Sequence, residues 1–586
     1  MKMIMRYLEK FKKECVLAPL FKMLEAVFEL FVPIVVSAII DKGIANDDIA
    51  FILKCSVMLV FLAMIGLASS ITAQYFSAKA AIGCATKLRY SVYEHILGLS
   101  FTDYDEVGTS TLITRLTSDI NQIQNGVNLV LRLFLRSPFI VFGAMIMAFT
   151  INVKIALVFV VTIPVLAFIV FGIMLITRPM YRDVQNKLDK VLLTTRENLT
   201  GVRVIRAFNK QAKENVKFKA ENEDLNKLQR VVGRISGLMN PLTYVVVNAA
   251  IVALIYFGAI KVNTGSMTQG QVVALYNYMS QILVELIKLA NLIVTITKAL
   301  ACAGRVESVL AIESSMDFVE KRQELGLDEN VSNNQPKLEL RNASLCYKGN
   351  SEDSVSNINL VAKKGDMIGI IGGTGSGKTT VANLISRFYD ATKGSVLIDG
   401  VDVKDIPREE LVKKVSVCMQ KAVLFSGTVR ENLTMGRKDI PEEVLEKAVE
   451  VSQSKEFLSK KEGYLDYMIN QGAKNLSGGQ KQRLNIARAL SASPEILILD
   501  DCSSALDYAT DAALRNAIVR DLKDVTTVII SQRAASLLNC TKIIVLDDGK
   551  MVGEGTHEEL LENCEIYKEI YDSQFSSQAK VVGDAH

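Results

Sequence analysis

The chain has 586 residues, which is more than one hydrophobic core usually organises, so two or three domains are expected. Hydrophobic residues make up 49% of it and the mean hydropathy is +0.25, and both values argue against a protein that is soluble throughout. The net charge of +4 is small for this length and lacks the basic footprint of nucleic-acid binding, so no nucleic-acid partner is expected. Nine scattered cysteines without a CxxC pair, and only three histidines, predict reduced thiols and no Cys/His metal site.

The first half of the chain holds most of the apolar excess. Six stretches are each long enough to span a bilayer, which takes about 20 apolar residues. Any one of them fits a buried core helix, but a soluble domain rarely stacks six, so a six-helix transmembrane domain is predicted. The stretches are 16–40, 49–75, 127–150, 155–176, 238–260 and 272–300.

The links between these stretches alternate in length and charge. Three links are short and hold few Lys or Arg, whereas residues 77–126 and 177–239 are long and rich in both, as is the N-terminus. The positive-inside rule therefore places the long links and both chain termini in the cytoplasm. Because structureless loops of that length are uncommon, the long links are predicted to be helical extensions of the spans. Short cross-helices that transmit motion are expected near 101–109 and 196–208.

Several ionisable residues fall within or beside the spans, where charges are rare and usually face a bundle interior or a wet cavity. Arg132 and Arg136 are four residues apart and share a helix face, while Glu285 and Lys288 are three apart and can pair. Two interpretations stay open. The charges form pairs within the bundle or at interfacial depth, or they line a polar cavity for a charged or amphipathic substrate.

A polar segment near 331–336 separates the apolar half from a region with α/β patterning. We expect a transmembrane domain over 1–320, a linker over 321–336, a nucleotide-binding domain over 337–580 and a tail over 581–586.

The nucleotide-binding domain opens with a phosphate-binding motif. Residues 372–379 (GGTGSGKT) match GxxxxGK[ST], following an apolar strand at 367–371 and preceding a helical run, as the motif requires. Backbone amides of the glycines are expected to surround the phosphates, Lys378 to reach the outer phosphates, and Thr379 to take a magnesium position.

A second motif identifies the type of nucleotide-binding domain. Residues 476–480 spell LSGGQ about a hundred residues after the phosphate loop, just before an apolar strand that ends in Asp500. This order resembles that of ATP-binding cassette (ABC) transporters, and six spans ahead of one cassette resemble an exporter-type half-transporter. The resemblance covers essentially the whole chain. It implies an all-α six-helix transmembrane domain of the exporter type followed by an α/β P-loop nucleotide-binding domain.

In this family two cassettes sandwich two ATP molecules, each between the phosphate loop of one chain and LSGGQ of the other. The resemblance assigns a role to further positions. Tyr347 matches the aromatic residue that stacks on adenine, and Gln420 matches the glutamine that contacts magnesium. Gln471 and Ala473 depart from the usual glutamate and glycine, which puts the family's contacts with the cytoplasmic helices in question.

With ATP and Mg²⁺ as cofactors, the implied residues form four groups. The nucleotide-binding group is Tyr347, Gly372, Gly373, Thr374, Gly375, Ser376, Gly377, Lys378, Thr379, Thr380 and Gln420; the signature that acts across the dimer is Leu476, Ser477, Gly478, Gly479 and Gln480; the dimer-interface loop holds Ser504 and Asp507; and the magnesium ligands are Thr379, Gln420 and Asp500.

Two positions at the implied hydrolytic centre differ from the family pattern. Asp501 stands where a glutamate orients the attacking water, and Gln532 stands where a histidine is usual. The shorter Asp501 side chain holds its carboxylate about 1 Å short, and a displacement of that size can cost roughly 10²-fold in rate. The Gln532 amide cannot carry the charge or hand over the proton that a histidine can. These residues predict a site that binds ATP but cleaves it poorly, with tolerated drift and retained activity as the alternative.

The expected function is therefore that of an ABC-type ATPase coupled to export of amphipathic small molecules, drugs or peptides, as the degenerate half of a heterodimer. The expected partners are a second ABC half-transporter, membrane lipid and a hydrophobic or amphipathic cargo. The expected location is a bacterial inner membrane, with the cassette in the cytoplasm. Two alternatives remain: an ATP-gated membrane switch or channel subunit that does not pump, and a homodimeric lipid or peptide exporter.

Overall fold

The computed structural model describes residues 2–319 and 335–583. Its contacts divide the chain into two compact units: a helical unit of Met1–Leu97 with Ser110–Ile312, and a sheet unit of Gly98–Thr109 with Glu313–His586. Six long apolar helices followed by a sheet-containing domain confirm the predicted fold class. Most of the predicted linker lies outside the described residues, as do the last three residues of the tail, so the domain boundaries stay predictions.

The helical unit contains six helical segments that are long and apolar enough to cross a membrane, among the described residues. Hydrophobic side chains dominate these segments, and backbone groups in lipid must pair within their own segment, which a helix achieves. Its main elements are α1 (Lys2–Leu8), α2 (Lys12–Ala38), α3 (Ile49–Gly98), α5 (Thr109–Thr114), α6 (Ile120–Leu133), α7 (Arg136–Ile151), α8 (Val153–Thr200), α9 (Val202–Ala207), α10 (Gln211–Gly237), α11 (Met239–Asn263) and α12 (Gln269–Leu310).

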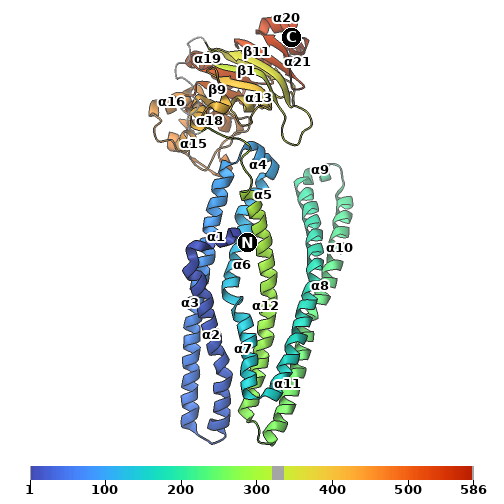
Figure 1. Ribbon diagram of the computed structural model, residues 1–586. Helices are drawn as coiled ribbons and strands as arrows, with labels where there is room; N and C mark the ends of the chain where they lie inside the picture. Colours follow the sequence, from blue (N-terminus) through green and yellow to red (C-terminus); the bar gives the residue numbers. More distant parts are fainter. Residues whose placement is uncertain (1, 320–334, 584–586) are drawn as a thin grey trace. The chain divides into compact units, whose positions relative to one another are not determined.

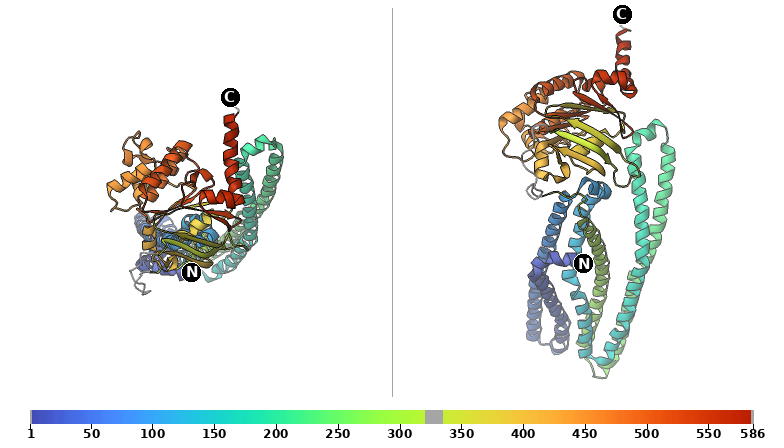
Figure 2. Two further views of the ribbon diagram at one scale, coloured as in Figure 1. Left: turned by 90° about the horizontal axis from the view of Figure 1, so that it is seen from above. Right: turned by 45° about the horizontal axis from the view of Figure 1, so that its top comes forward.

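Several of these helices are far longer than a bilayer is thick. The 50 residues of α3 correspond to about 75 Å, against a hydrocarbon core of about 30 Å. The structure therefore builds the long links as helical extensions, and α8 and α10 run side by side over their charged parts (Figures 1 and 2). The short helix α9 lies at the turn between them, within the predicted cross-helix at 196–208.

A single apolar core joins α2, α7, α8, α11 and α12. Phe159, Leu254 and Tyr278 are fully buried in it. The Tyr278 hydroxyl donates to the carbonyl oxygen of Leu30 at 2.6 Å, so the polar end of this side chain is satisfied inside the bundle.

The sheet unit is built on one ten-stranded sheet in the order β5-β4-β1-β2-β12-β11-β3-β10-β9-β6. Strands β11, β3, β10, β9 and β6 are parallel neighbours, and they are largely apolar, as strands covered by helices on both faces are. The strands are β1 (Leu338–Leu345), β2 (Val355–Ala362), β3 (Met367–Gly372), β4 (Lys393–Ile398), β5 (Val401–Asp402), β6 (Val415–Cys418), β9 (Ile496–Asp500), β10 (Thr526–Ile530), β11 (Lys542–Asp547) and β12 (Lys550–Gly555), with β7 (Gly427–Thr428) and β8 (Met468–Ile469) in a small separate sheet.

Apolar clusters pack on the sheet and beneath the neighbouring helices. The carboxyl ends of the parallel strands share one edge, and ligands of open α/β sheets bind at such an edge. The helices are α13 (Lys378–Ile385), α14 (Arg408–Lys414), α15 (Val429–Thr434), α16 (Glu442–Val451), α17 (Lys455–Leu458), α18 (Gly478–Leu490), α19 (Tyr508–Asp521), α20 (His557–Asn563) and α21 (Glu565–Gly583).

One short helix that follows α3 in the chain belongs to the sheet unit. This helix, α4 (Phe101–Val107), occupies the predicted cross-helix at 101–109. The Phe101 ring lies 4.8 Å from that of Phe388, measured between centroids. The Tyr389 hydroxyl donates to Asp105 at 2.5 Å. The segment between α3 and α5 is therefore anchored on the sheet unit of its own chain.

Candidate nucleotide-binding site

The phosphate-binding loop connects the end of β3 to the start of α13. Gly377 has a φ of +90°, and a Cβ at this position would lie 2.4 Å from Cγ1 of Val355, so only glycine fits. Lys378 Nζ donates to the carbonyl oxygens of Gly372 at 2.9 Å and Gly373 at 2.5 Å. The lysine is thus held inside the loop, where phosphate oxygens can replace those carbonyls.

The loop opens into a pocket of about 400 Å³ at the carboxyl edge of the parallel strands. Of the predicted residues, Tyr347, Thr374, Gly375, Gly377, Lys378, Thr379, Thr380, Gln420, Asp500, Asp501 and Gln532 line it, while Gly372, Gly373 and Ser376 bond to Lys378 behind the lining. Asp353, Ser354, Asp548 and Gly549 also line the pocket and were missed by the sequence analysis. The Asp-Gly pair at 548–549 is a turn signal, but it carries no information that the turn faces a ligand.

The two acidic residues follow one another at the end of β9. Thr379 Oγ1 donates to Asp500 Oδ1 at 3.2 Å, and Gln420 Nε2 donates to Asp501 Oδ2 at 3.2 Å. Asp501 has a φ of +45°, which aspartate tolerates better than most residues. Strand β10 runs parallel beside β9, and Gln532 follows it two residues later. The structure therefore places Asp501 and Gln532 in the same pocket as the residues predicted to bind the nucleotide.

Burial sets the electrostatics of this pocket. It raises the pKa of Asp500, whose side chain is also close to the Asp501 charge. It likewise raises the pKa of Asp501, against the effect of the Gln420 hydrogen bond. Burial lowers the pKa of Lys378, although the two carboxylates oppose this. All three charges are thus weakly solvated, and ligands of opposite charge would stabilise them.

The donor set fits magnesium brought in with a nucleotide. Within residues 2–319 and 335–583, no three His, Cys, Asp or Glu side chains gather into a metal site of their own. Mg²⁺ is typically held by one or two carboxylates plus phosphate oxygens and water. The buried Asp500 carboxylate and the Thr379 hydroxyl are oxygen donors of this kind, and Gln420 lies on the same pocket wall.

The aromatic residue expected to contact adenine lies at the pocket margin. Asn383 Nδ2 donates to the Tyr347 hydroxyl at 3.1 Å, and that hydroxyl lies 3.3 Å from Thr380 Oγ1. The ring also meets Tyr389 edge-on, with 4.9 Å between centroids. Two side chains of α13 therefore fix its orientation, and its ring contacts Tyr389, the residue that donates to Asp105 of α4.

The LSGGQ segment is absent from the lining of this pocket and forms a helix start instead. Ser477 caps α18, and its side chain and that of Gln480 form a reciprocal capping box. In the interface loop, the Ser504 hydroxyl donates to the Asp501 carbonyl at 3.0 Å, and Asp507 caps α19. Ahead of LSGGQ, Ala473 has a φ of +52°, a conformation that favours the glycine usual in the family.

The loop that carries Gln532 is held by α21, which the sequence analysis did not anticipate. Gln574 Nε2 donates to the Gln532 carbonyl at 2.8 Å, and the Ala534 amide donates to Gln574 Oε1 at 2.9 Å. A glutamine on a C-terminal helix gives no local signal for such a contact. The pair of bonds holds the Gln532 backbone in place.

The predicted membrane charges meet in the helical unit. Arg136 donates to Glu285 at 2.7 Å and to Glu29 at 2.6 Å, joining α7, α12 and α2. Lys288 donates to Glu285 at 2.8 Å. The buried Nε atom of Arg132 has no hydrogen-bond partner among the described residues. The paired geometry favours the interpretation of ion pairs within the bundle for three of the four candidate cavity residues.

Comparison with known families matches both halves of the chain. Residues 15–286 match the ABC transporter transmembrane region, and residues 355–504 match the ABC transporter family of ATP-binding domains. The fold is similar to a structure described as a bacterial Atm1-family ABC exporter with ATP bound. That likeness has a TM-score of 0.76 at 20% identity, covering 96% of this chain and 98% of the other.

Curated relatives match over nearly the full length. The uncharacterized ABC transporter ATP-binding protein YfiB of Bacillus subtilis is 32% identical over 94% of this chain and 95% of its own. An ATP-dependent lipid A-core flippase of Syntrophus aciditrophicus is 31% identical over 83% of this chain and 80% of its own. With spans and ATP-binding domain fused in one polypeptide, the chain belongs to the ABC transporter family as an exporter-type half-transporter.

Proposed function

We propose that this chain is the catalytically weakened half of a heterodimeric ABC exporter, which holds ATP at its own phosphate loop and completes a competent site for its partner. ATP-driven export follows from membership in the exporter family. The observation that carries the weakened role is the position of Asp501 and Gln532. Both line the same pocket as Lys378 and Thr379, so both departures fall where ATP would be cleaved.

The chemistry at this pocket would favour holding over cleaving. Lys378 and the loop amides neutralise phosphate charge, and Mg²⁺ held by Thr379, Gln420 and Asp500 would supply further positive charge when bound. Asp501 already accepts a hydrogen bond from Gln420, so its short side chain is directed toward that amide. Gln532 can accept or donate a hydrogen bond at the phosphate but cannot take up a proton there. Binding groups are complete while the water-activating groups are altered.

The position of LSGGQ supports a two-chain site. Ser477 lies at the N-terminus of α18, outside the pocket of its own chain, and helix N-termini favour anions. In the proposed pair, the partner's phosphate loop and glutamate would meet this intact LSGGQ to form the competent site. The partner's LSGGQ would close the pocket around Asp501, where ATP acts as a long-lived clamp.

The cargo proposed is an amphipathic small molecule, drug or peptide. A relative is named a lipid A-core flippase, which supports a cargo with an apolar part. The ion pairs among α2, α7 and α12 leave Glu29 and Lys288 about 40% exposed, so the bundle offers polar groups beside apolar ones. The cassette and both termini are proposed to be cytoplasmic, in a bacterial inner membrane.

The experiment that tests this role compares the purified chain alone with the chain paired with a half-transporter that carries Glu and His at the equivalent positions. Alone, the chain should bind ATP and turn it over slowly. In the pair, Asp501→Glu with Gln532→His should change turnover modestly, whereas loss of the partner's glutamate should nearly abolish it. Lys378→Ala serves as the control that removes ATP binding at this chain's own loop.

Two results would overturn the proposal. Brisk turnover by the chain alone, with no second kind of chain present, would show that Asp501 and Gln532 do not weaken hydrolysis. Unchanged turnover after removal of the partner's glutamate would show that the competent site had been assigned to the wrong chain. An ATP-responsive conductance without vectorial transport would instead favour the alternative of a gated switch.

A further inference from the structure

An apolar groove lies between α8 and α11, away from the nucleotide site. Its volume is about 620 Å³, and aliphatic and aromatic side chains form nearly all of its wall, among them Val158, Val161, Ala250 and Phe257. The hydroxyl of Thr162, which also lines it, donates to the Val158 carbonyl at 2.7 Å. Because the Thr162 hydroxyl already donates within its own helix, this part of the groove suits a hydrocarbon chain.

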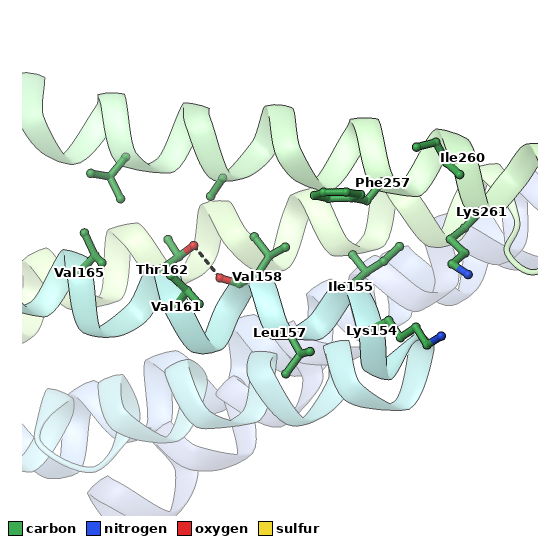
Figure 3. Close-up of a pocket in the computed structure, with 12 residues that line it drawn as sticks. Lys154, Ile155, Leu157, Val158, Val161, Thr162, Val165, Phe257, Ile260 and Lys261 are labelled. Atoms are coloured by element: carbon green, nitrogen blue, oxygen red, sulfur yellow. Dashed lines mark hydrogen bonds between the residues drawn. The ribbon is translucent and has the colours of Figure 1, made fainter.

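Two lysines stand at one end of the groove. Lys154 lies in the first turn of α8 and Lys261 in the last turn of α11, and Figure 3 shows both side chains at the same end. Within residues 2–319 and 335–583, neither ammonium group has a carboxylate within 4.0 Å. A cation at a helix N-terminus is disfavoured by the helix dipole, so Lys154 in particular would gain from an anion.

The α8 wall of the groove is about as long as one leaflet is deep. From Lys154 to Val165, at the far end of the α8 wall, the axial rise is about 16 Å at 1.5 Å per residue. Half of a hydrocarbon core of about 30 Å is nearly the same depth. The lysines flank short links that the positive-inside rule places on the outer side, so the groove would run from the outer interface to the bilayer centre.

We propose that this groove binds an anionic phospholipid of the outer leaflet, with an acyl chain along α8 and α11 and the phosphate between Lys154 and Lys261. The apolar wall provides affinity for the chain, and the unpaired ammonium groups provide selectivity for a negative headgroup. A neutral lipid would contact the apolar wall but would bring no net negative charge to the two lysines. A helix of a second chain is the alternative occupant, and the crosslinking experiment below distinguishes it from a lipid. The site is independent of the proposed role of Asp501.

Photo-crosslinking identifies the occupant directly. A benzoyl-phenylalanine placed at Val161, whose side chain lines the groove and is 66% exposed, is activated in the complete transporter in its membrane. The expected product is the chain plus one phospholipid, enriched in anionic headgroups. The same probe at Phe168, which is 81% exposed on α8 but outside the groove, should capture lipids in the proportions of the membrane. A covalent product between two chains at Val161 would overturn the proposal and assign the groove to a subunit interface.

Headgroup selectivity tests the lysines. Native mass spectrometry of the transporter titrated with phosphatidylglycerol or phosphatidylcholine should show a preference of roughly 10-fold to 30-fold for the anionic lipid, as two lysines near a surface supply. Lys154→Gln with Lys261→Gln should reduce the preference to about onefold. Lys42→Gln, in another short link and outside the groove, is the matched control and should leave it unchanged.

Two further variants separate loss of charge from loss of folding. Lys154→Arg with Lys261→Arg keeps both charges and should retain the preference for phosphatidylglycerol. Val161→Trp fills the groove and should reduce retention of both lipids. The proposal fails if the unaltered protein binds both lipids equally, or if the double glutamine variant, eluting as the native assembly, keeps its preference.

Discussion

Asp500, which is proposed to hold magnesium, has a buried carboxylate that destabilises the nucleotide-free protein. Its side chain is 5% exposed and accepts a hydrogen bond from Thr379 at 3.2 Å. Burial raises its pKa, so the ionised form is destabilised in the folded state until a cation arrives. Because the folded pKa exceeds the unfolded one, Asp500 makes folding less favourable as the pH rises from the usual aspartate pKa of about 3.9 through the folded pKa.

Replacing this carboxylate should therefore stabilise the nucleotide-free protein. Asp500→Asn keeps an oxygen that accepts from Thr379 but removes the buried charge. The melting temperature should rise by a few degrees at neutral pH, and the difference should vanish below the usual aspartate pKa. Scanning fluorimetry with an added dye measures this, since the chain contains no tryptophan. With Mg²⁺ and ATP the order should reverse; a variant less stable than the parent without ligand would contradict the argument.

Tyr347 offers a separable test at the adenine end of the pocket. Tyr347→Phe removes only the hydroxyl that Asn383 and Thr380 hold, whereas Tyr347→Ala removes the ring as well. Aromatic contacts contribute about 0.5–1.5 kcal/mol, so the alanine variant should bind ATP up to about 10-fold more weakly. The phenylalanine variant should differ little from the parent. Isothermal titration calorimetry with an ATP analogue measures both affinities. Equal losses of affinity in the two variants would show that the hydroxyl, and not the ring, contributes to binding.

At the scale of elements, α4 is the predicted cross-helix, and it is built into the sheet unit of its own chain. Residues on either side of it belong to the helical unit, yet α4 itself is anchored to the sheet unit. Phe101 contacts Phe388 and Tyr389, and Tyr389 in turn contacts Tyr347 at the pocket margin. A chain of aromatic contacts thus connects the loop between two spans with the nucleotide pocket.

Removing the aromatic contact should weaken the coupling between transport and ATP turnover more than it weakens ATP binding. Phe101→Ala removes the ring that meets Phe388 but leaves the pocket lining intact. Stimulation of ATP turnover by transported compounds should fall severalfold while the affinity for ATP is kept. Phe61→Ala, at an exposed position on α3, is the control and should retain stimulation. Loss of ATP binding in Phe101→Ala would mean that α4 supports the cassette fold instead.

The ion cluster of Arg136, Glu285 and Glu29 joins three helices of the bundle. Arg136 is 7% and Glu285 is 3% exposed. Removing one partner of a buried pair typically costs about 3–5 kcal/mol because the other charge is left uncompensated. Arg136→Met should therefore lower thermal stability in detergent sharply, whereas Arg136→Met with Glu285→Leu should recover much of the loss. Losses that simply add in the double variant would show that the two side chains do not interact energetically.

At the scale of the whole molecule, the phosphate loop and the LSGGQ segment of one chain lie apart. The phosphate loop lines its pocket, while LSGGQ lies elsewhere on the same domain. In the proposed pair, this chain's LSGGQ serves the competent site and its phosphate loop serves the clamp. The two motifs should therefore differ in their importance for turnover.

Gly478→Asp provides that comparison. A Cβ at Gly478 meets nothing within 4 Å in the chain itself, so the fold should tolerate the change. The new carboxylate would face the phosphates of ATP bound to the partner and should reduce turnover of the pair by roughly 100-fold or more, as loss of transition-state positioning does. Lys378→Ala in this chain should reduce turnover far less. Equal effects of the two variants would indicate two equivalent sites and contradict the asymmetric assignment.

Features encoded in contiguous residues were predictable. Hydropathy alone located the six spans, because about 20 apolar residues in a row have few alternatives to a membrane helix. The order of the phosphate loop, LSGGQ and Asp500 predicted a cassette, and the parallel strands placed all but LSGGQ at one edge. The cross-helix at 101–109 was also foreseen, since a long charged link had to contain structure.

Features that join distant residues were not predictable in the same way. No sequence pattern near Phe101 predicts its contact with Phe388. None near Gln574 predicts its hydrogen bonds to the loop of Gln532. The charges of Arg136 and Glu285 suggested either pairs or a cavity, and only the packing of α7 against α12 brought them within 2.7 Å. The sequence by itself determined the spans and the cassette, because local propensity and motif spacing act over short stretches. Tertiary structure alone decided the aromatic link, the ion cluster and the groove between α8 and α11, because these depend on how separate helices and strands pack.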